Sequence, residues 1–350
     1  MSTPPGLDLS RLAVYLHDHA PGLVTEPINA ELIAGGRSNL TYVVNEVFVL
    51  RRPPLGHVLA TAHDMAREYR IISALGPTPV PVPEALLLCE DDSVLGAPFY
   101  LMARVPGVVL RSRRQTDPLG DDARREVAFA MMDTLADLHR VDPAAIGLAD
   151  FGRPEGFLER QVRRWSKQLA QSTSRDLPDA EVLRDRLAAG IPVSATTAIV
   201  HGDYRLDNLI VDPTTMRVAA VLDWEMATLG DPLTDLGLLL AYWTVLDRLK
   251  TGFNPIADGL GADAGFPSGD ALLARYAKTR FAESGSVEGE GALDDLHWYV
   301  AMACYKLAVI LEGIHFRYTS GQTVGAGFDQ IGALVPPLLA QGLAAINGES

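Results

Sequence analysis

Apolar and polar positions alternate in the first part of the chain in the manner of short strands. Residues 31–44 and 46–50 are predicted to form two strands of a hairpin, with GGRSNLTY marking a turn and TYVVNEVFVL alternating between faces. Apolar residues at helical spacing predict a helix over 59–75. The segment PTPVPVPEALLLCE then ends the helix and enters a strand, and APFYLMARVPG predicts a further strand followed by a turn.

Helical periodicity dominates the remainder of the chain. Helices are predicted over 121–140, 157–172, 231–249, 270–281, 293–316 and 331–346. Two short strands are expected between them, at 208–211 and 217–222, separated by the turn DPTT. The pattern predicts an α+β protein, with a smaller strand-containing lobe over residues 1–105 and a mainly helical lobe over 106–350.

Composition limits the classes of partner. The 350 residues carry a formal net charge of −14, which disfavours nonspecific binding to nucleic acid and to anionic membranes. The longest uncharged apolar run, Leu236–Leu246, is shorter than the roughly 18 residues that span a bilayer, and the N-terminal segment lacks a signal pattern. We therefore expect a cytoplasmic protein without membrane contact. Cys89 and Cys304 are far apart and are expected to be free thiols.

Three polar residues in and after the segment HGDYRLDNLIVD suggest phosphate chemistry. Phosphoryl transfer requires positioning, a metal that neutralises charge, and an acceptor for the proton of the attacking hydroxyl. Asp203 and Asn208, five residues apart, allow one short loop to offer a base and a metal ligand. Asp223 follows the apolar run VAAVL, where its carboxylate can hold magnesium. Taken alone, an aspartate at a strand end is more often a turn residue or a helix cap; the combination with His201 and Gly202 is what makes the pattern specific.

Together, HGDYRLDN and VLDWEMATLGDPLTDLG resemble the signature of the aminoglycoside phosphotransferase and choline kinase-like family, relatives of the protein kinases. The resemblance is greatest to the subgroup whose kinase domain occurs fused to, or encoded near, acyl-CoA dehydrogenases. It covers residues 33–243 and implies a two-lobed protein-kinase-like fold. It also implies that Asp203 is the catalytic base, that Asn208 and Asp223 bind Mg²⁺, and that ATP is the phosphoryl donor.

The family resemblance further implies that the hairpin GGRSNLTY covers the nucleotide phosphates. Gly35 and Gly36 permit close approach of the backbone, while Ser38 and Asn39 can donate to phosphate oxygens. An ordinary hairpin turn is the alternative interpretation. Adenine is expected to bind near the backbone between Met102 and Val105, although YLMARVPG also fits a core strand and turn.

A kinase also needs a cation on the strand after this hairpin, held by a carboxylate of the next helix. VFVLRRPP offers Arg51, and Glu68 lies in the predicted helix. Arginine stands here in place of the usual lysine, but its planar guanidinium can bind phosphate through two hydrogen bonds. Arg52 is the competing candidate, and strand alternation predicts that it faces the opposite side of the sheet.

Several neighbouring residues have more than one interpretation. Arg205 either reaches the transferred phosphoryl group or is a solvated arginine, and Glu225 is a possible additional metal ligand. The resemblance implies that Asp235 holds the backbone of the catalytic loop. His201 is expected to be a structural loop residue, and His139 a helix-end residue.

The sequence thus predicts an ATP-dependent O-phosphotransferase acting on a small hydroxylated molecule. The resemblance to the subgroup points to a hydroxyacyl compound or another small hydroxylated metabolite. A catalytically silent nucleotide-binding module and an aminoglycoside or macrolide antibiotic kinase are the alternatives. A protein kinase is disfavoured because seven residues separate Asp223 from Asp231, too few for a peptide-docking activation loop. Two basic clusters could supply positive charge for a CoA thioester: Arg111–Gln115, and Arg160, Arg163, Arg164 and Lys167. A solvated face is the commoner interpretation of each cluster. Oligomeric state and the choice between ATP and GTP stay open.

Overall fold

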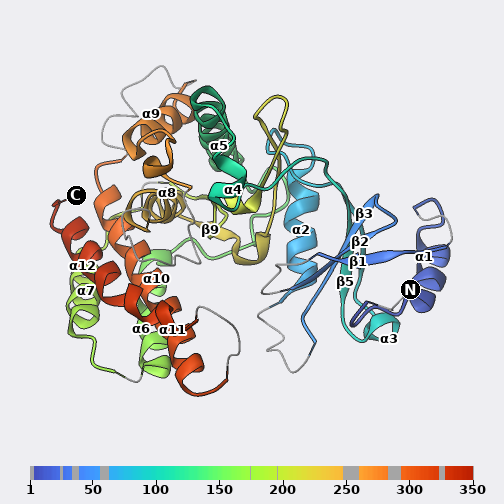
Figure 1. Cartoon of the computed structure of the whole chain (residues 1–350), viewed down its shortest axis with the longest axis horizontal. Coiled ribbons are helices and arrows are strands. Elements are labelled where there is room, and N and C mark those ends of the chain that lie inside the picture. Colours follow the sequence, from blue (N-terminus) through green and yellow to red (C-terminus); the bar gives the residue numbers. More distant parts are fainter. Residues whose placement is uncertain are drawn as a thin grey trace. The chain divides into compact units, whose positions relative to one another are not determined.

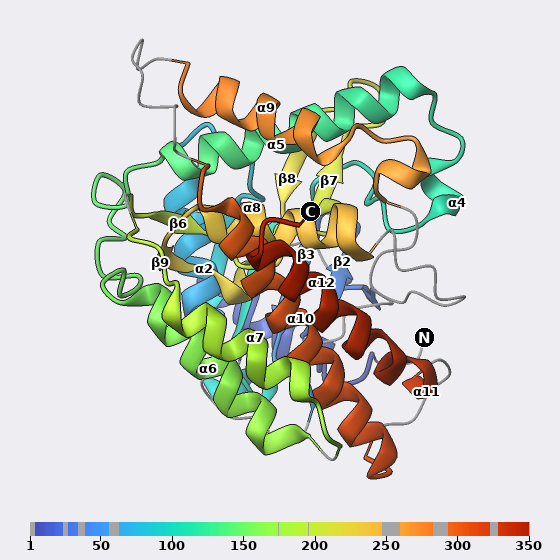
Figure 2. The same ribbon diagram turned by 90° about the vertical axis from the view of Figure 1, so that its left-hand side faces the viewer.

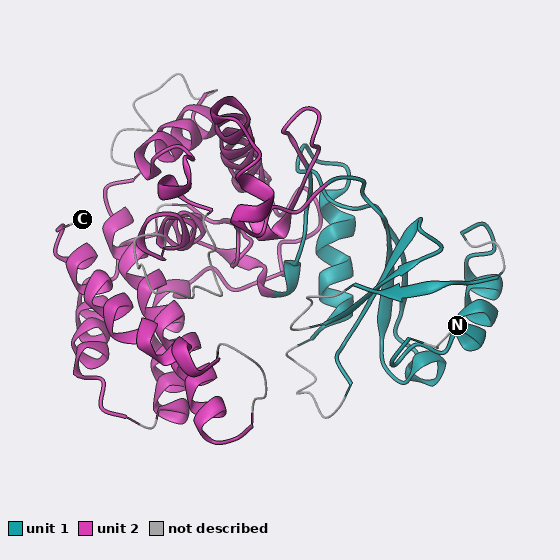
Figure 3. Cartoon of the chain, in the orientation of Figure 1, with its two compact units in different colours: residues 1–107, 219–225 teal, residues 108–218, 226–350 magenta. Residues whose placement is uncertain are grey.

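The computed structural model describes residues 4–23, 27–33, 39–55, 63–173, 175–194, 196–246, 260–282, 293–322 and 328–349. The chain divides into two compact units (Figure 3). Unit 1 comprises Met1–Gly107 and Ala219–Glu225, and unit 2 comprises Val108–Val218 and Met226–Ser350. The short second stretch of unit 1 is tied to the first by a backbone hydrogen bond, in which Val221 N–H donates to the Pro81 carbonyl at 2.8 Å.

Unit 1 contains a five-stranded antiparallel sheet in the order β1-β2-β3-β5-β4. The strands are β1 (Ala30–Leu32), β2 (Leu40–Val44), β3 (Phe48–Arg52), β4 (Ala85–Cys89) and β5 (Phe99–Ala103). Asn45 and Glu46, both with positive φ, form the tight turn between β2 and β3, a conformation that asparagine tolerates well. The predicted strand segment 31–44 holds two strands, because the chain reverses direction between Leu32 and Leu40.

Helices cover both faces of this sheet. On one face, α1 (Leu9–His19) contributes Leu12 and Leu16 to a core that also contains Leu50 and Phe99. On the other face lies α2 (Met65–Leu75), as Figure 1 shows. The helix predicted over 59–75 begins at Met65, where Asp64 caps its N-terminus; residues 59–62 lie outside the described residues. The sequence pattern did not predict α1 or the short α3 (Asp92–Leu95).

Unit 2 is mainly helical. Its helices are α4 (Arg113–Thr116), α5 (Asp121–Arg140), α6 (Phe157–Ser172), α7 (Pro178–Ala189), α8 (Leu233–Leu240), α9 (Gly269–Arg280), α10 (Leu296–Thr319), α11 (Phe328–Ile331) and α12 (Val335–Ile346). The bounds of α5 and α6 are those that periodicity predicts. The helix predicted over 231–249 begins at Leu233 and continues beyond α8 as a π-helix, Ala241–Leu246; residues 247–249 lie outside the described residues.

Short strands lie next to the loops that contain the predicted site residues. β6 (Ala198–Val200) pairs antiparallel with β9 (Thr228–Gly230), and neither strand was predicted from the sequence. β7 (Leu209–Val211) follows a 3₁₀ turn, Leu206–Asn208. β8 (Val218–Val221) carries the chain from unit 2 back to unit 1. The segments that hold the predicted catalytic and metal-binding residues therefore lie directly after β6 and directly after β8.

The long helix α10 is the centre of unit 2. It packs against α6, α7, α8 and α12, which lie beside it in Figure 2. Among the described residues it is the one helix whose length and hydropathy would suffice for a membrane span, but 67% of that apolar window is buried in the protein. Burial between neighbouring helices is the usual reason for such composition in a core helix. Gly237 of α8 makes this packing close, since a Cβ there would lie 2.5 Å from the Tyr299 backbone.

Candidate active site

Arg51 is the centre of a charged cluster in unit 1. Alternation along β3 directs Arg51 towards α2, where its Nε lies 3.0 Å from Oε2 of Glu68. The same guanidinium is hydrogen-bonded to Asp223, and its Nη2 lies 3.7 Å from Oε2 of Glu225. The side chains of Arg51 and Glu68 are only 12% and 2% exposed. The predicted strand cation and helix carboxylate are thus brought together, with two further carboxylates from the segment after β8.

Hydrogen bonds hold Glu68 in place from two sides. Tyr100 donates its hydroxyl to Oε2 at 3.0 Å, and Asn39 donates its amide to Oε1 at 3.1 Å. The same amide group of Asn39 donates to Glu225 at 3.2 Å. Burial raises the pKa of Glu68, and the adjacent Arg51 opposes this rise. For Arg51, burial alone would lower the pKa, but Glu68 and the other acidic neighbours outweigh burial and raise it.

Asp223 has an unusual backbone conformation. Its φ is 66°, in the left-handed region, which aspartate adopts more readily than most residues but still with strain. The buried indole of Trp224 fixes this turn by donating Nε1–H to the Val221 carbonyl at 3.0 Å. The Asp223 side chain remains 31% exposed. A strained backbone that presents a carboxylate is characteristic of functional sites.

In unit 2, the loop after β6 brings Asp203 and Asn208 together. The amide nitrogen of Asn208 donates to Oδ2 of Asp203 at 3.1 Å and to its backbone carbonyl at 2.8 Å. Tyr242 donates its hydroxyl to Oδ1 of Asp203 at 3.3 Å. The Asp203 carboxylate is thus oriented from both sides, as a group that accepts a proton at a defined position requires.

The backbone before Asp203 is held by a buried carboxylate. Asp235 accepts hydrogen bonds from the N–H groups of His201 and Gly202, at 2.7 and 2.8 Å. Nε2 of His139 lies 3.2 Å from the same carboxylate. Burial alone would raise the pKa of Asp235, but the hydrogen bonds and positive character of His139 outweigh it, and the pKa is lowered. His139 lies in the last turn of α5, as predicted, and is also a buried partner of Asp235.

Gly202 occupies a position that no other residue could fill without strain. Its φ is 84°, and a Cβ on it would lie 2.8 Å from the Met226 carbonyl oxygen. Lys306 of α10 donates its ammonium group to the Gly202 carbonyl at 2.8 Å and lies over the ring of Trp165. Burial lowers the pKa of Lys306, while Asp203 and Asp235 oppose this effect.

Arg205 lies against the same loop. Its guanidinium is 3.7 Å from Asp203 and 3.2 Å from Asp207, and it stacks over the ring of Tyr242. Burial raises the pKa of Asp207, and Arg205 opposes that rise. This arrangement places a cation beside the carboxylate predicted to be the base; whether Arg205 reaches the phosphoryl group stays a prediction.

The other predicted residues are less informative. Gly35, Gly36 and Ser38 lie outside the described residues. Met102 is a buried residue of β5, paired with Val49 of β3, and Val105 lies in the irregular segment after β5. The proposed contacts of these residues with a nucleotide stay predictions.

Some residues of the site could not have been selected from the sequence. Tyr242, Lys306 and Tyr100 come from helices and a strand whose patterns are those of ordinary core elements. Only the scarcity of lysine, with four in the chain, could have drawn attention to Lys306. The described residues contain no group of three or more His, Cys, Asp or Glu side chains arranged to hold a metal ion.

Comparison with known proteins extends these findings. Residues 29–272 match the phosphotransferase enzyme family. Acyl-CoA dehydrogenase family member 11 of Gallus gallus is 34% identical over 349 residues, which cover 96% of this chain and 43% of that protein. Acyl-CoA dehydrogenase family member 10 of Mus musculus is 36% identical over 318 residues, 89% of this chain and 28% of that protein. The chain thus spans less than half the length of these relatives.

Solved structures show the same fold. A crystal structure from Ralstonia eutropha, of a protein named as a candidate aminoglycoside phosphotransferase, is 34% identical with a TM-score of 0.81. The alignment covers 97% of this chain and 98% of that one. The GDP complex of aminoglycoside 2'-phosphotransferase-IIIa matches with a TM-score of 0.62 at 15% identity, covering 98% and 100% of the two chains. The predicted α+β, two-lobed protein-kinase-like fold is confirmed.

Proposed function

Because this chain belongs to the phosphotransferase enzyme family, we propose that it transfers the γ-phosphoryl group of ATP to a hydroxyl group of a small molecule. The observation that carries this proposal is the geometry around Asp203. Its carboxylate is oriented by Asn208 and Tyr242, and the backbone before it is fixed by Asp235. A carboxylate held in one orientation in this way is suited to accept the proton of an attacking hydroxyl.

The reaction balances with these residues in their predicted roles. The substrate oxygen forms a bond to the γ-phosphorus while the bond from that phosphorus to the β–γ bridging oxygen breaks, so that ADP leaves. The hydroxyl proton passes to Asp203. Arg205 offsets the negative charge near this carboxylate. Arg51, oriented by Glu68, binds phosphate oxygens of the nucleotide.

The donor groups fit magnesium. Asp223 presents a partly exposed carboxylate, and because the amide nitrogen of Asn208 is used by Asp203, its Oδ1 is the atom available to a cation. Carboxylate and amide oxygens are ligands that Mg²⁺ accepts, with water and phosphate completing its coordination. Bound magnesium would neutralise charge on the phosphates. We propose Asn208 and Asp223 as its protein ligands.

For the acceptor, we propose a hydroxyacyl compound, in particular a hydroxyacyl-CoA. The relatives named as acyl-CoA dehydrogenase family members support an acyl compound as the substrate class. Exposed basic side chains on α6, Arg163, Arg164 and Lys167, could attract the phosphates of CoA. The match of this chain to the phosphotransferase family argues against dehydrogenation by the chain itself.

An antibiotic kinase is the second candidate, and the name of the Ralstonia eutropha protein is the observation that favours it. A mass-spectrometric screen separates the candidates. The protein is incubated with Mg-ATP and a pool of hydroxyacyl-CoAs, hydroxy acids, sugars and aminoglycosides, and products heavier by one phosphoryl group are scored. Hydroxyacyl products support the first candidate, and phosphorylated aminoglycosides support the second.

The Asp203→Asn variant tests the catalytic assignment. Turnover should fall by about 10²- to 10⁴-fold, the usual contribution of general base catalysis, while ATP binding persists. Asp212→Asn is a matched control, since the Asp212 carboxylate caps the turn after β7 by accepting from the N–H groups of Thr214 and Thr215. Wild-type turnover in Asp203→Asn would refute Asp203 as the base. Binding of ATP with no product from any hydroxyl compound would favour the silent nucleotide-binding module.

A further inference from the structure

Arg52 is a buried cation that the proposed reaction does not use. Its residue is 4% exposed, and strand alternation directs it to the face of the sheet opposite Arg51, as predicted. Its Nη1 donates to the carbonyl oxygens of Gly6 and Leu95, the latter at 2.9 Å. Within the part of the chain that the structure describes, Nε of Arg52 has no hydrogen-bond partner and no carboxylate pairs with the guanidinium. Arg51, one residue earlier, has three carboxylates around it.

Burying a guanidinium without a counter-ion is unfavourable. Burial lowers the pKa of Arg52, and only the Tyr42 phenol opposes this effect. Buried charges in proteins are normally paired, and an unpaired one is destabilising. Two carbonyl oxygens satisfy one nitrogen of the fork but supply no negative charge. The missing anion must therefore come from elsewhere if the charge is to be neutralised.

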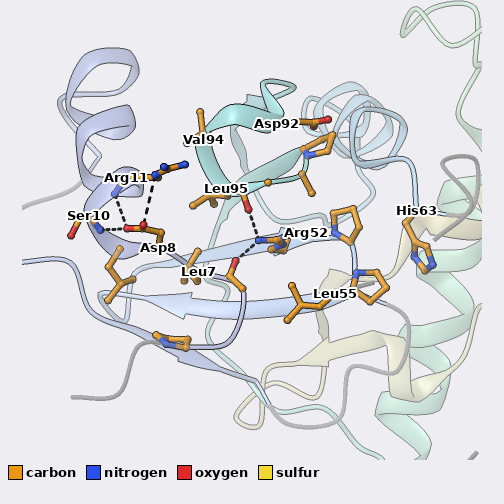
Figure 4. Close-up of a pocket in the computed structure, with 18 residues that line it drawn as sticks. Leu7, Asp8, Ser10, Arg11, Arg52, Leu55, His63, Asp92, Val94 and Leu95 are labelled. Atoms are coloured by element: carbon orange, nitrogen blue, oxygen red, sulfur yellow. Dashed lines mark hydrogen bonds and ion pairs between the residues drawn. The ribbon is translucent and has the colours of Figure 1, made fainter. Parts of the chain in front are cut away.

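Arg52 lines a cavity of about 1080 Å³ in unit 1 (Figure 4). In this view Arg52 lies among the apolar side chains of Leu7, Leu55 and Leu95. Pro53, Pro54, Val94, Ala97 and Pro98 extend the apolar lining. The cavity thus combines one buried cation with a lining that is partly apolar and partly polar.

The other polar groups of the lining are already engaged or peripheral. Asp8 caps α1 by accepting from the N–H groups of Ser10 and Arg11, and the side chain of Arg11 lies 3.8 Å from it (Figure 4). Nδ1 of His63 lies 2.7 Å from the Asn39 amide oxygen, and burial together with Arg51 lowers the pKa of His63. Asp92 is exposed at the start of α3. The charge that an entering ligand would meet inside is that of Arg52.

We propose that this cavity binds a small organic monocarboxylate. Its carboxylate pairs with the Arg52 guanidinium, and its apolar body packs against Leu55, which is 57% exposed, and against the partly exposed Pro53 and Pro98. A carboxylate matches the planar fork of arginine with two hydrogen bonds. One buried cation neutralises a single negative charge, whereas a phosphate dianion would retain excess charge beside the apolar part of the lining. The site lies on the other face of β3 from Arg51 and does not depend on the proposed phosphoryl transfer.

The test is isothermal titration of the full chain with octanoate as the probe. Octanol, which keeps the apolar body without the charge, and inorganic phosphate, which keeps the charge without the apolar body, are titrated in parallel. One equivalent of octanoate should bind, and both comparison compounds should bind about 10- to 100-fold more weakly, the usual effect of losing a charge-assisted contact. Absence of octanoate binding overturns the proposal, as does equal binding of octanol or tighter binding of phosphate.

Two variants place the ligand at Arg52. Leu55→Glu introduces a carboxylate at a lining side chain that is 57% exposed, so folding should persist while the new carboxylate competes for Arg52. Octanoate affinity should fall by about 10- to 100-fold. Val14→Glu, on a 64% exposed residue of α1 outside the cavity, makes the same charge change and should leave affinity unchanged. Equal octanoate affinities in the two variants would refute the site. Arg52→Met removes the cation itself and, if the variant folds, should also weaken octanoate binding.

Discussion

At the residue scale, the least expected feature is that Arg51 forms ion pairs with both Glu68 and Asp223. These two partners come from segments far apart in the chain, and both lie within reach of one guanidinium. The arginine's forked geometry explains why it can replace a lysine in this cluster, because Nε meets Glu68 while Nη2 meets Asp223. A lysine ammonium would retain the charge but would have to share one nitrogen between the two carboxylates.

The Arg51→Met and Arg51→Lys variants should therefore differ. Arg51→Met leaves buried Glu68 without a cation and should lower the free energy of unfolding by about 3–5 kcal/mol. Arg51→Lys keeps the charge and should lose less stability, with a raised KM for ATP. Urea denaturation and nucleotide kinetics measure the two effects, with Arg104→Met, an exposed arginine of unit 1, as control. Equal stability of all three variants would show that the cluster does not stabilise the fold.

Asp235 makes a pH-dependent contribution to stability. Its pKa is lowered from the ordinary value of 3.8, so the folded state favours the ionised carboxylate. The contribution is therefore present above about pH 4 and is lost as the pH falls through the lowered pKa of the folded state. Asp235→Asn should lower the free energy of unfolding at pH 7 by about 1.5–3 kcal/mol, because an amide replaces a charged hydrogen-bond acceptor.

Denaturation at a series of pH values checks this expectation. The wild type should lose stability below pH 4 more steeply than Asp235→Asn. Glu126→Gln, which changes an exposed carboxylate on α5 to an amide, should leave the slope unchanged. Parallel slopes for the wild type and Asp235→Asn would contradict a lowered pKa as the source of the acid sensitivity.

At the element scale, the contact between α8 and α10 positions the candidate active site. α8 carries Asp235, whose carboxylate holds the loop after β6, and α10 carries Lys306, whose ammonium group binds the Gly202 carbonyl. The two helices approach closely at Gly237, where α8 has no side chain. The separation of these helices therefore sets the position of two groups that hold the same loop.

Gly237→Ala should disturb both folding and catalysis. The added Cβ would lie 2.5 Å from the Tyr299 backbone, so the helices must move apart, at a cost of about 1–3 kcal/mol. Thermal denaturation and kcat should both fall. Gly120→Ala is the matched control, because a Cβ there has no atom within 4 Å and its φ of −71° suits alanine. Unchanged stability in Gly237→Ala would mean that α8 and α10 adjust without strain.

At the scale of the whole molecule, charge is unevenly distributed. The chain has a net charge of −14, yet α6 exposes Arg163, Arg164 and Lys167, while its Trp165 is buried. Long basic side chains on an otherwise acidic protein create a local positive potential, which attracts anionic ligands at low ionic strength. This arrangement is compatible with the proposed CoA thioester but is also found on ordinary solvated helix faces.

Charge reversal distinguishes these two interpretations. In the double variant Arg163→Glu and Arg164→Glu, the KM for a hydroxyacyl-CoA should rise about tenfold while the KM for ATP is unchanged. The effect should diminish as salt concentration increases. Arg125→Glu with Arg217→Glu, a reversal of two other exposed arginines, serves as control. Identical acyl-CoA kinetics in both double variants would identify the α6 residues as a solvated face.

The sequence by itself determined the local elements and the chemical motif. Helical periodicity gave the bounds of α5 and α6 because both helices bury one continuous apolar stripe. The spacing of Asp203 and Asn208 indicated a loop with a carboxylate and an amide, and the structure brings these side chains to 3.1 Å. Spacing of this kind is visible in sequence because both residues belong to one short segment.

Only the tertiary structure decided which distant residues complete these local arrangements. Periodicity places Tyr242 and Lys306 on helices, but not beside Asp203 and Gly202, since these contacts depend on how the helices pack. Strand alternation places Arg51 and Arg52 on opposite faces of the sheet. Only the fold surrounds Arg51 with carboxylates. It leaves Arg52 buried beside a cavity, with no paired carboxylate among the described residues. Local patterns report which face a side chain takes, whereas its partners are set by packing between segments remote in the chain.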